Sequence, residues 1–161
     1  MTIDDYNKAV EQNADGVYRF ILKNCRNEAL AQDVVQESFE KLWVKIDTIA
    51  GEKAKSYLFT TAYHTMVDVL RKEKRITDFD QTNEGMHFHT DQYNDLNEVL
   101  DQALKMIPEI QRTVILLRDY EGYSYDEIAE ITSLSESQVK VYIYRGRLNL
   151  KSYLVKMEHV I

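Results

Sequence analysis

The chain is poor in the residues that form crosslinks and turns. Its 161 residues include one cysteine (Cys25), one proline and five glycines. A lone cysteine excludes an internal disulfide, and all-β folds generally need more glycine and proline for their turns. No hydrophobic run reaches the ~18 residues of a membrane-spanning helix. The acidic N-terminus MTIDDYNKAV lacks the apolar core of a signal peptide. We therefore expect an all-α protein in the cytoplasm with no membrane insertion of its own.

The net charge of −7 is concentrated in one segment. From Asp78 to Asp101 the chain has seven acidic residues and no lysine or arginine, so the other 20 acidic residues balance the 20 basic ones. The stretch TDFDQTNEGMHFHTDQYND is polar and weakly periodic, as linkers are. We expect two small helical domains, 1–76 and 95–161, joined by an acidic flexible linker at 77–94. A plain solvated tether is the simplest interpretation of that linker.

Apolar residues at helical spacing predict three helices in the first domain. The first spans about 3–25 and could divide at Gly16, and the second follows Asn27, a plausible N-cap, and runs to about 46. The apolar stripe of the second helix comprises Val35, Phe39, Leu42, Trp43 and Ile46. The third helix spans about 54–75 and ends in the basic cluster RKEKR. Cations at a helix C-terminus complement the helix dipole, which is sufficient to explain this cluster.

The third helix also carries aromatic side chains before its basic end: Tyr57, Phe59, Tyr63 and His64. Rings that stack on unpaired bases, next to cations that hold phosphates, are typical of proteins that bind single-stranded DNA. Aromatic residues on a helix are more often part of a hydrophobic core. The residues alone leave both interpretations open.

The second domain has the pattern of a helix-turn-helix. A helix over about 96–106 precedes Pro108, which suits the first turn of a new helix that ends near Gly122. Ser124 with Glu127, and Ser135 with Gln138, then form two capping boxes. Two capped helices around the short corner TSLS indicate a helix-turn-helix. A helical hairpin inside some other bundle is the alternative.

The second helix of such a motif enters the major groove of DNA with its N-terminal residues against base edges. The candidates for base contacts are Glu136, Ser137, Gln138, Lys140 and Val141. Arg145, Arg147 and Lys151 are candidates for phosphate contacts.

The sequence contains no catalytic constellation and no glycine-rich phosphate loop, so we expect neither an enzyme nor a cofactor. His87 and His89 lie close together in the linker. Two imidazoles without two further ligands make a weak metal site.

Three segments of the chain carry a resemblance to a known family. They are AQDVVQESFEKLW, KSYLFTTAYHTMVDVLRKEKR and IPEIQRTVILLRDYEGYSYDEIAEITSLSESQVKVYIYRGRLNLK. In this order, they resemble the bacterial RNA polymerase sigma factors of the extracytoplasmic-function group over nearly the whole chain. Several positions depart from the family pattern, among them Tyr57 for tryptophan, His64 for asparagine, Ser133 for glycine, Gln138 for threonine and Tyr142 for arginine.

The resemblance implies an alternative sigma factor that binds core RNA polymerase and recognises two promoter elements. It would melt promoter DNA without ATP, have an anti-sigma factor as a partner and be a monomer when free. The implied polymerase contacts are Asp33, Val34, Gln36, Glu37, Phe39 and Glu40. The implied contacts to the start-proximal element are Lys53, Lys55, Ser56, Tyr57, Thr60, Tyr63, His64, Arg71, Lys72 and Arg75. The upstream element would be read from Glu136 to Arg147, a range that includes Tyr142 and Tyr144.

Two rival functions remain at this stage. A free-standing helix-turn-helix regulator would bind duplex DNA without polymerase, and a helical adaptor would bind only protein. Because His64 and Tyr142 depart from the family pattern, the promoter sequence cannot be copied from relatives.

Overall fold

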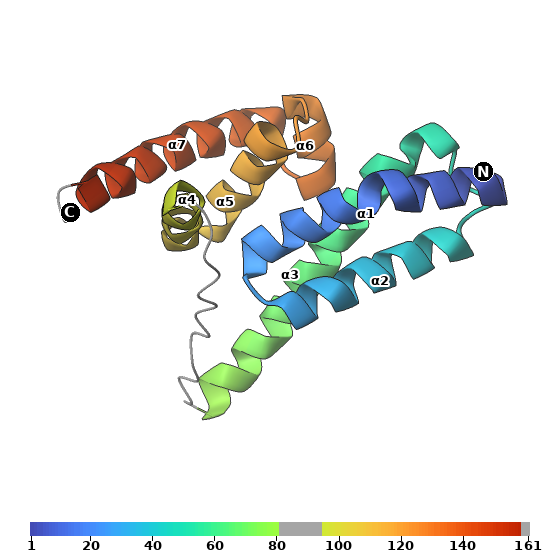
Figure 1. Ribbon diagram of the computed structural model, residues 1–161, viewed down its shortest axis with the longest axis horizontal. Coiled ribbons are helices and arrows are strands. Elements are labelled where there is room, and N and C mark those ends of the chain that lie inside the picture. The colour runs from blue at the N-terminus through green and yellow to red at the C-terminus, as the bar shows by residue number, and fades with distance from the viewer. Residues whose placement is uncertain (81–94, 159–161) are drawn as a thin grey trace.

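The chain folds into two groups of helices, and the computed structural model describes residues 1–80 and 95–158 (Figure 1). The first group comprises α1 (Ile3–Cys25), α2 (Glu28–Val44), the short 3₁₀ turn η1 (Gly51–Lys53) and α3 (Ala54–Asp80). The second comprises α4 (Asp95–Met106), α5 (Glu109–Ile115), the π-helical turn η2 (Leu116–Tyr120), α6 (Tyr125–Thr132) and α7 (Glu136–Glu158). The prediction of an all-α fold with two helical domains is confirmed.

Side-chain caps fix where the first two helices begin. The Thr2 hydroxyl accepts a hydrogen bond from the Asp5 amide (3.1 Å), and the Thr2 amide donates to the Asp5 carboxylate (3.0 Å). The Asn27 side chain accepts from the Leu30 amide at 3.0 Å, so the predicted N-cap of α2 is confirmed. The helix over 3–25 does not divide at Gly16, and α1 continues through it.

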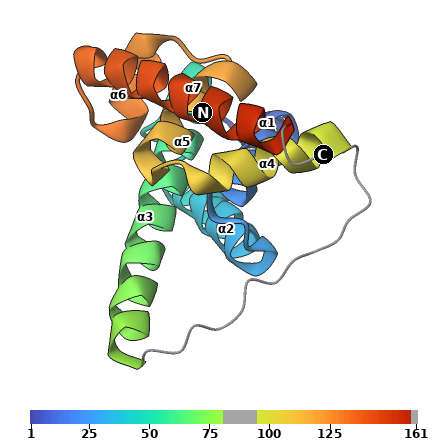
Figure 2. The same cartoon turned by 90° about the vertical axis from the view of Figure 1, so that its left-hand side faces the viewer.

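The third helix is longer than its sequence suggests. We predicted an end near Arg75, but α3 continues to Asp80. Polar, acidic residues after the basic cluster resemble a linker in composition, yet they can still form backbone hydrogen bonds of a helix. The C-terminal turns of α3 project away from the other helices (Figures 1 and 2). The rest of the predicted linker lies outside the described residues.

The second domain departs from expectation after Pro108. The helix that we expected to run to Gly122 is α-helical only to Ile115 and then widens into the π-helical turn η2. Gly122 has a φ of 77°, which is the left-handed conformation that favours glycine after a helix. The capping box of α6 is confirmed, because the Ser124 hydroxyl accepts from the Glu127 amide (3.2 Å) and the Ser124 amide donates to the Glu127 carboxylate (3.0 Å).

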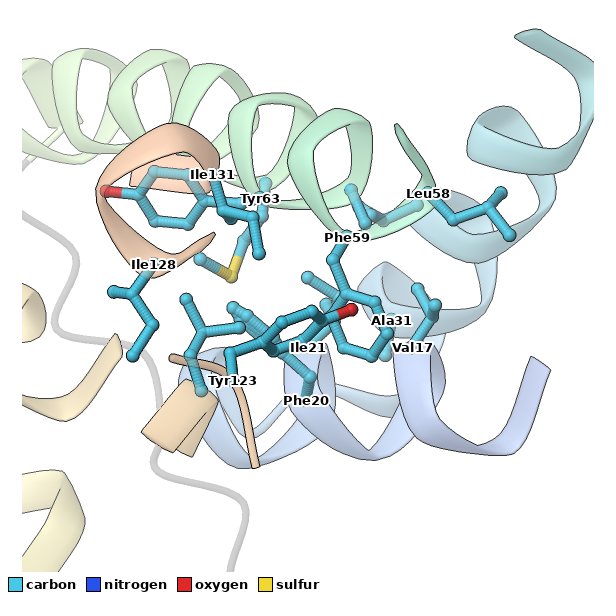
Figure 3. Close-up of a cluster of buried hydrophobic side chains, with 14 of the residues drawn as sticks. Val17, Phe20, Ile21, Ala31, Leu58, Phe59, Tyr63, Tyr123, Ile128 and Ile131 are labelled. Atoms are coloured by element: carbon cyan, nitrogen blue, oxygen red, sulfur yellow. The ribbon is translucent and has the colours of Figure 1, made fainter. Parts of the chain in front are cut away.

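The two domains share one hydrophobic core. Phe20 and Phe59 from the first domain lie in the same buried cluster as Tyr123, Ile128 and Ile131 from the second (Figure 3). A smaller cluster belongs to the second domain alone and comprises Leu104, Ile107, Ile115 and Leu116. The packing of α6 against α3 joins the domains directly.

Candidate nucleic-acid interface

The helix-turn-helix is formed by α6, its corner and α7. Ser133 occupies the corner with a φ of 61°, a left-handed conformation that glycine adopts more easily. Val139 and Ile143, one helical turn apart, are buried and fix α7 against the core. The opposite side of α7 therefore faces solvent.

This exposed side of α7 carries nearly all of the predicted contacts to the upstream element. The exposed members are Glu136, Ser137, Gln138, Lys140, Val141, Tyr144, Arg145 and Arg147. Tyr142 is half-buried and packs against the shared core. We call the eight exposed residues the recognition face.

Gln138 already has a structural partner. Its side-chain oxygen accepts a hydrogen bond from the Ser135 backbone amide (2.9 Å), while the Gln138 backbone amide donates to the Ser135 hydroxyl (3.1 Å). This is the predicted capping box of α7. A bidentate contact with adenine uses both ends of a glutamine amide. To make that contact, the side-chain oxygen of Gln138 would have to share or break its hydrogen bond with the Ser135 backbone amide.

Two cations of the recognition face are paired with carboxylates of the same domain. Arg147 makes two hydrogen bonds to Asp119, at 2.6 and 3.2 Å, which raise the pKa of its guanidinium. Lys140 lies 3.8 Å from Glu136, one turn earlier on α7. A phosphate would compete with these carboxylates for the two cations.

The predicted contacts to the start-proximal element lie along η1 and α3 in three states of exposure. Fully exposed residues are Lys53, Lys55, Arg71, Lys72 and Arg75. Half-buried residues are Ser56, Tyr57, Thr60 and His64. Tyr63 is buried, with 8% of its surface exposed, and burial raises the pKa of its hydroxyl.

The aromatic residues of α3 do not form one stacking surface. Phe59 is 1% exposed and stacks on Phe20 with ring centroids 5.6 Å apart. It also meets Tyr123 of the second domain edge-to-face at 5.2 Å. For Phe59 the hydrophobic-core interpretation is confirmed. Tyr63 lies in the same buried cluster, so the structure does not present its ring for stacking on a base.

The predicted polymerase contacts on α2 divide between the two sides of the helix. Asp33, Gln36, Glu37 and Glu40 are exposed. Val34 and Phe39 are buried at 1% and 9% exposure, so they hold α2 on the core. The sequence also placed Trp43 in the core, but it is 47% exposed next to Val44 at 81%. Periodicity missed this apolar pair because Trp43 lies at the edge of the buried stripe.

Other kinds of site find little support within the described parts of the chain. In residues 1–80 and 95–158, no helix has the length and apolar character needed to cross a bilayer. The same residues contain no group of three or more histidine, cysteine or acidic side chains that could hold a metal ion. His87 and His89 lie outside the described residues.

Comparisons with known proteins match both domains. The Sigma-70 region 2 model matches residues 9–76 and the Sigma-70 region 4 model matches residues 97–150. The RNA polymerase sigma factor SigV of Bacillus subtilis is 33% identical over 144 residues, which cover 86% of this chain and 84% of SigV. The chain belongs to the extracytoplasmic-function sigma factors. SigM of Bacillus subtilis, a member of this group, is 27% identical over 157 residues and 94% of both chains.

The arrangement of the two domains also has a counterpart among solved sigma factors. The sigma factor RpoE, in complex with the anti-sigma factor NepR from Bartonella quintana, aligns with a TM-score of 0.82 and 27% identity. The alignment covers 94% of this chain and 98% of RpoE. As a sigma factor, the protein directs promoter-specific transcription together with core RNA polymerase. A free-standing regulator is not favoured, because the region 2 match lies outside the helix-turn-helix.

Proposed function

We propose that this sigma factor divides promoter recognition between residues 1–76 and 95–161, with 77–94 as the connection. The observation that carries the proposal is the recognition face of α7, a polar and basic surface held outward by two buried residues, Val139 and Ile143. This face reads the upstream element. Base edges are contacted near the start of α7, and Arg145 and Arg147 hold phosphates.

The first domain holds the start-proximal element. Lys53, Lys55 and Ser56, at the start of α3, cradle an unpaired base, and the exposed basic end of α3 follows the backbone. Between the start of α3 and its basic end, the path of the DNA is lined by Tyr57, Thr60, Tyr63 and His64. DNA opens because unstacked bases bind the protein more tightly than paired ones, so the protein acts without ATP and is not an enzyme.

Core polymerase binds the exposed side of α2. Asp33, Gln36, Glu37 and Glu40 recur at intervals of three or four residues, which places them along one side of the helix. Val34 and Phe39 contribute indirectly, by packing the opposite side of α2 against the core.

We further propose that the protein is a cytoplasmic monomer when free and is controlled by an anti-sigma factor. This chain resembles RpoE over nearly its whole length, and RpoE was solved in complex with an anti-sigma factor. The resemblance supports an anti-sigma factor as a partner.

The test is transcription from promoter libraries with purified core polymerase. We expect specific start sites that require the full chain, and loss of these starts in an Arg145→Ala, Arg147→Ala double variant. A Lys8→Ala, Lys156→Ala double variant removes two exposed cations that have no assigned contact, and it serves as the matched control for charge. The rival regulator predicts a sequence-specific footprint from the protein alone and no polymerase-dependent start. That outcome would contradict the proposal.

A further inference from the structure

The two paired cations of the recognition face differ in where their partners come from. The Arg147 guanidinium donates two hydrogen bonds to the Asp119 carboxylate, from Nε at 3.2 Å and from Nη2 at 2.6 Å. Two parallel hydrogen bonds of this kind orient a guanidinium as well as neutralise its charge. Lys140 makes one contact of 3.8 Å with Glu136 on its own helix. Of these two pairs, only that of Arg147 depends on how the second domain folds.

Asp119 is held in position by the π-helical turn η2. Leu116 and Leu117 of this turn are at most 1% exposed, and the Glu121 amide donates to the Leu116 carbonyl at 3.0 Å. A π-helical turn joins residues five apart rather than four, and such turns are frequent at functional sites. The Asp119 side chain thus extends toward α7 from a turn that is anchored in the core.

The two elements approach closely at the residue before Arg147. A Cβ atom at Gly146 would overlap the side chain of Ile115 and lie 3.2 Å from Cβ of Gln111. Glycine at this position therefore lets α7 lie directly against α5, and Figure 1 shows the two helices side by side. Because η2 follows α5 without a break, this close approach brings Arg147 within reach of Asp119.

Asp119 neutralises a cation that we assign to a DNA phosphate. The side chains of Arg147 and Asp119 are 50% and 38% exposed, so a phosphate can approach the pair from solvent. An unpaired arginine attracts a phosphate and releases a counterion from the DNA when it binds. The paired guanidinium offers little net charge, and the Asp119 carboxylate repels the incoming phosphate. Binding a phosphate therefore gains less free energy at Arg147 than at an unpaired cation.

We propose that Asp119 competes with promoter DNA for Arg147 and so limits how tightly the recognition face binds the DNA backbone. The inference rests on the phosphate contact proposed above for Arg147. The competition weakens backbone contacts on every DNA sequence, whereas base contacts near the start of α7 are not affected by it. Binding at the recognition face then depends more strongly on base contacts.

The first measurement is the affinity of the holoenzyme for a promoter duplex that the wild type selects from the promoter libraries. Asp119→Asn removes the charge and keeps the size of the side chain. It should tighten binding about two- to fivefold at low salt, as expected for one partly exposed ion pair. It should also steepen the fall of log affinity with log salt by up to about 0.9, because Arg147 then acts as one more free cation. Filter binding over a range of potassium chloride concentrations measures both quantities.

Two control variants test whether the charge of Asp119 causes this effect. Asp119→Glu keeps a carboxylate and should bind like the wild type. Glu98→Gln removes an exposed acid of α4, outside the recognition face, and should change neither the affinity nor the slope. An equal gain from either control would overturn the proposal, because the carboxylate at position 119 would then not be the cause. Thermal melts check that each variant remains folded.

The decisive comparison repeats the substitution without the cation. Arg147→Ala should weaken binding and flatten the salt slope, because one phosphate contact is lost. In this background Asp119→Asn should lose most of its effect, since the group for which it competes is absent. An equal gain in both backgrounds would contradict the competition, because it would reflect only a general reduction in negative charge.

The remaining outcomes separate this inference from the proposed function. If Arg147→Ala changes neither affinity nor slope, both the phosphate contact of Arg147 and the competition are wrong. If Arg147→Ala weakens binding but Asp119→Asn does not tighten it, the phosphate contact stands and the competition is wrong. Weaker binding by Asp119→Asn would also overturn the competition, because Asp119 would then orient Arg147 toward the phosphate.

Discussion

The two surfaces that we assign to promoter DNA differ in how far their side chains are exposed to solvent. The recognition face, assigned to the upstream element, is exposed to solvent, and Tyr144 in the middle of α7 is 66% exposed. The surface on η1 and α3 that we assign to the start-proximal element is partly buried, and Tyr63 in the middle of α3 is 8% exposed. Under the proposed assignments, the upstream surface can bind DNA after Lys140 and Arg147 exchange their carboxylate partners, whereas the ring of Tyr63 must first become exposed.

Removing the ring that joins the domains should have the largest effect. Phe59→Ala deletes a fully buried ring packed against Phe20 and Tyr123, and a change of this type lowers the free energy of unfolding by about 3–5 kcal/mol. Urea denaturation of the full chain measures it. Leu104→Ala is the matched control, because Leu104 is buried in the cluster of the second domain alone and its loss should lower the free energy of unfolding by about 2–5 kcal/mol whether or not the domains share a core. A loss below about 1 kcal/mol for Phe59→Ala would show that the shared core is not formed in solution.

Removing the basic side chains at the projecting end of α3 should have the next largest effect. Each phosphate contact that is lost reduces the slope of log affinity against log salt by about 0.7–0.9. An Arg71→Ala, Lys72→Ala, Arg75→Ala variant should therefore flatten the slope for holoenzyme binding to promoter by about two, across promoter sequences. Filter binding from low to high salt measures this slope. An unchanged slope would remove these three residues from the DNA surface.

The two capping boxes provide a comparison inside the helix-turn-helix. Ser124→Ala and Ser135→Ala should each lower the free energy of unfolding by about 1 kcal/mol, because each leaves a helix N-terminus without its side-chain acceptor. Only Ser135→Ala disturbs the capping box that engages Gln138, so only this variant should change base preference at the upstream element. Thermal melts and selection from randomised DNA measure the two effects. Identical base preferences for both variants would show that Gln138 does not read DNA.

The smallest expected effect is a change in how the free energy of unfolding depends on pH in the acidic range. Hydrogen bonds from Ser124 hold the pKa of Glu127 below its ordinary value of 4.5. Because the pKa is lowered in the folded state, the contribution of Glu127 is fully present above about pH 4.5 and is lost as the pH falls through the folded pKa. Glu127→Gln should therefore melt with a weaker acid dependence than the wild type, by differential scanning calorimetry between pH 6 and pH 3. Equal acid dependence in the two proteins would contradict this assignment.

Local signals predicted the helices better than the contacts between them. Asn27, Ser124 and Ser135 mark helix starts because capping depends on residues only three positions apart. The π-helical turn from Leu116 to Tyr120 and the extension of α3 to Asp80 carry no such local signal.

The candidate sites show the same limit. The recognition face followed from two caps and an apolar stripe within α7. Tyr63 is buried in a cluster that also contains Ile128 and Ile131 of α6, which comes some 60 residues later in the sequence. Arg19 and Lys23 look like ordinary surface charges until Glu121 and Asp101 are placed opposite them. Pairings at such distances in the sequence cannot be read from helical periodicity.

Hydroxyl-radical footprinting of the tyrosines in the free, full-length chain is the most direct test of the contrast between the two surfaces. Oxidation rates read by mass spectrometry compare Tyr63 with Tyr144 in one sample, with and without core polymerase. The account predicts that Tyr144 reacts quickly and Tyr63 slowly in the free protein, and that the oxidation rate of Tyr63 rises when polymerase is added. Equal rates for Tyr63 and Tyr144 in the free wild-type chain would contradict it.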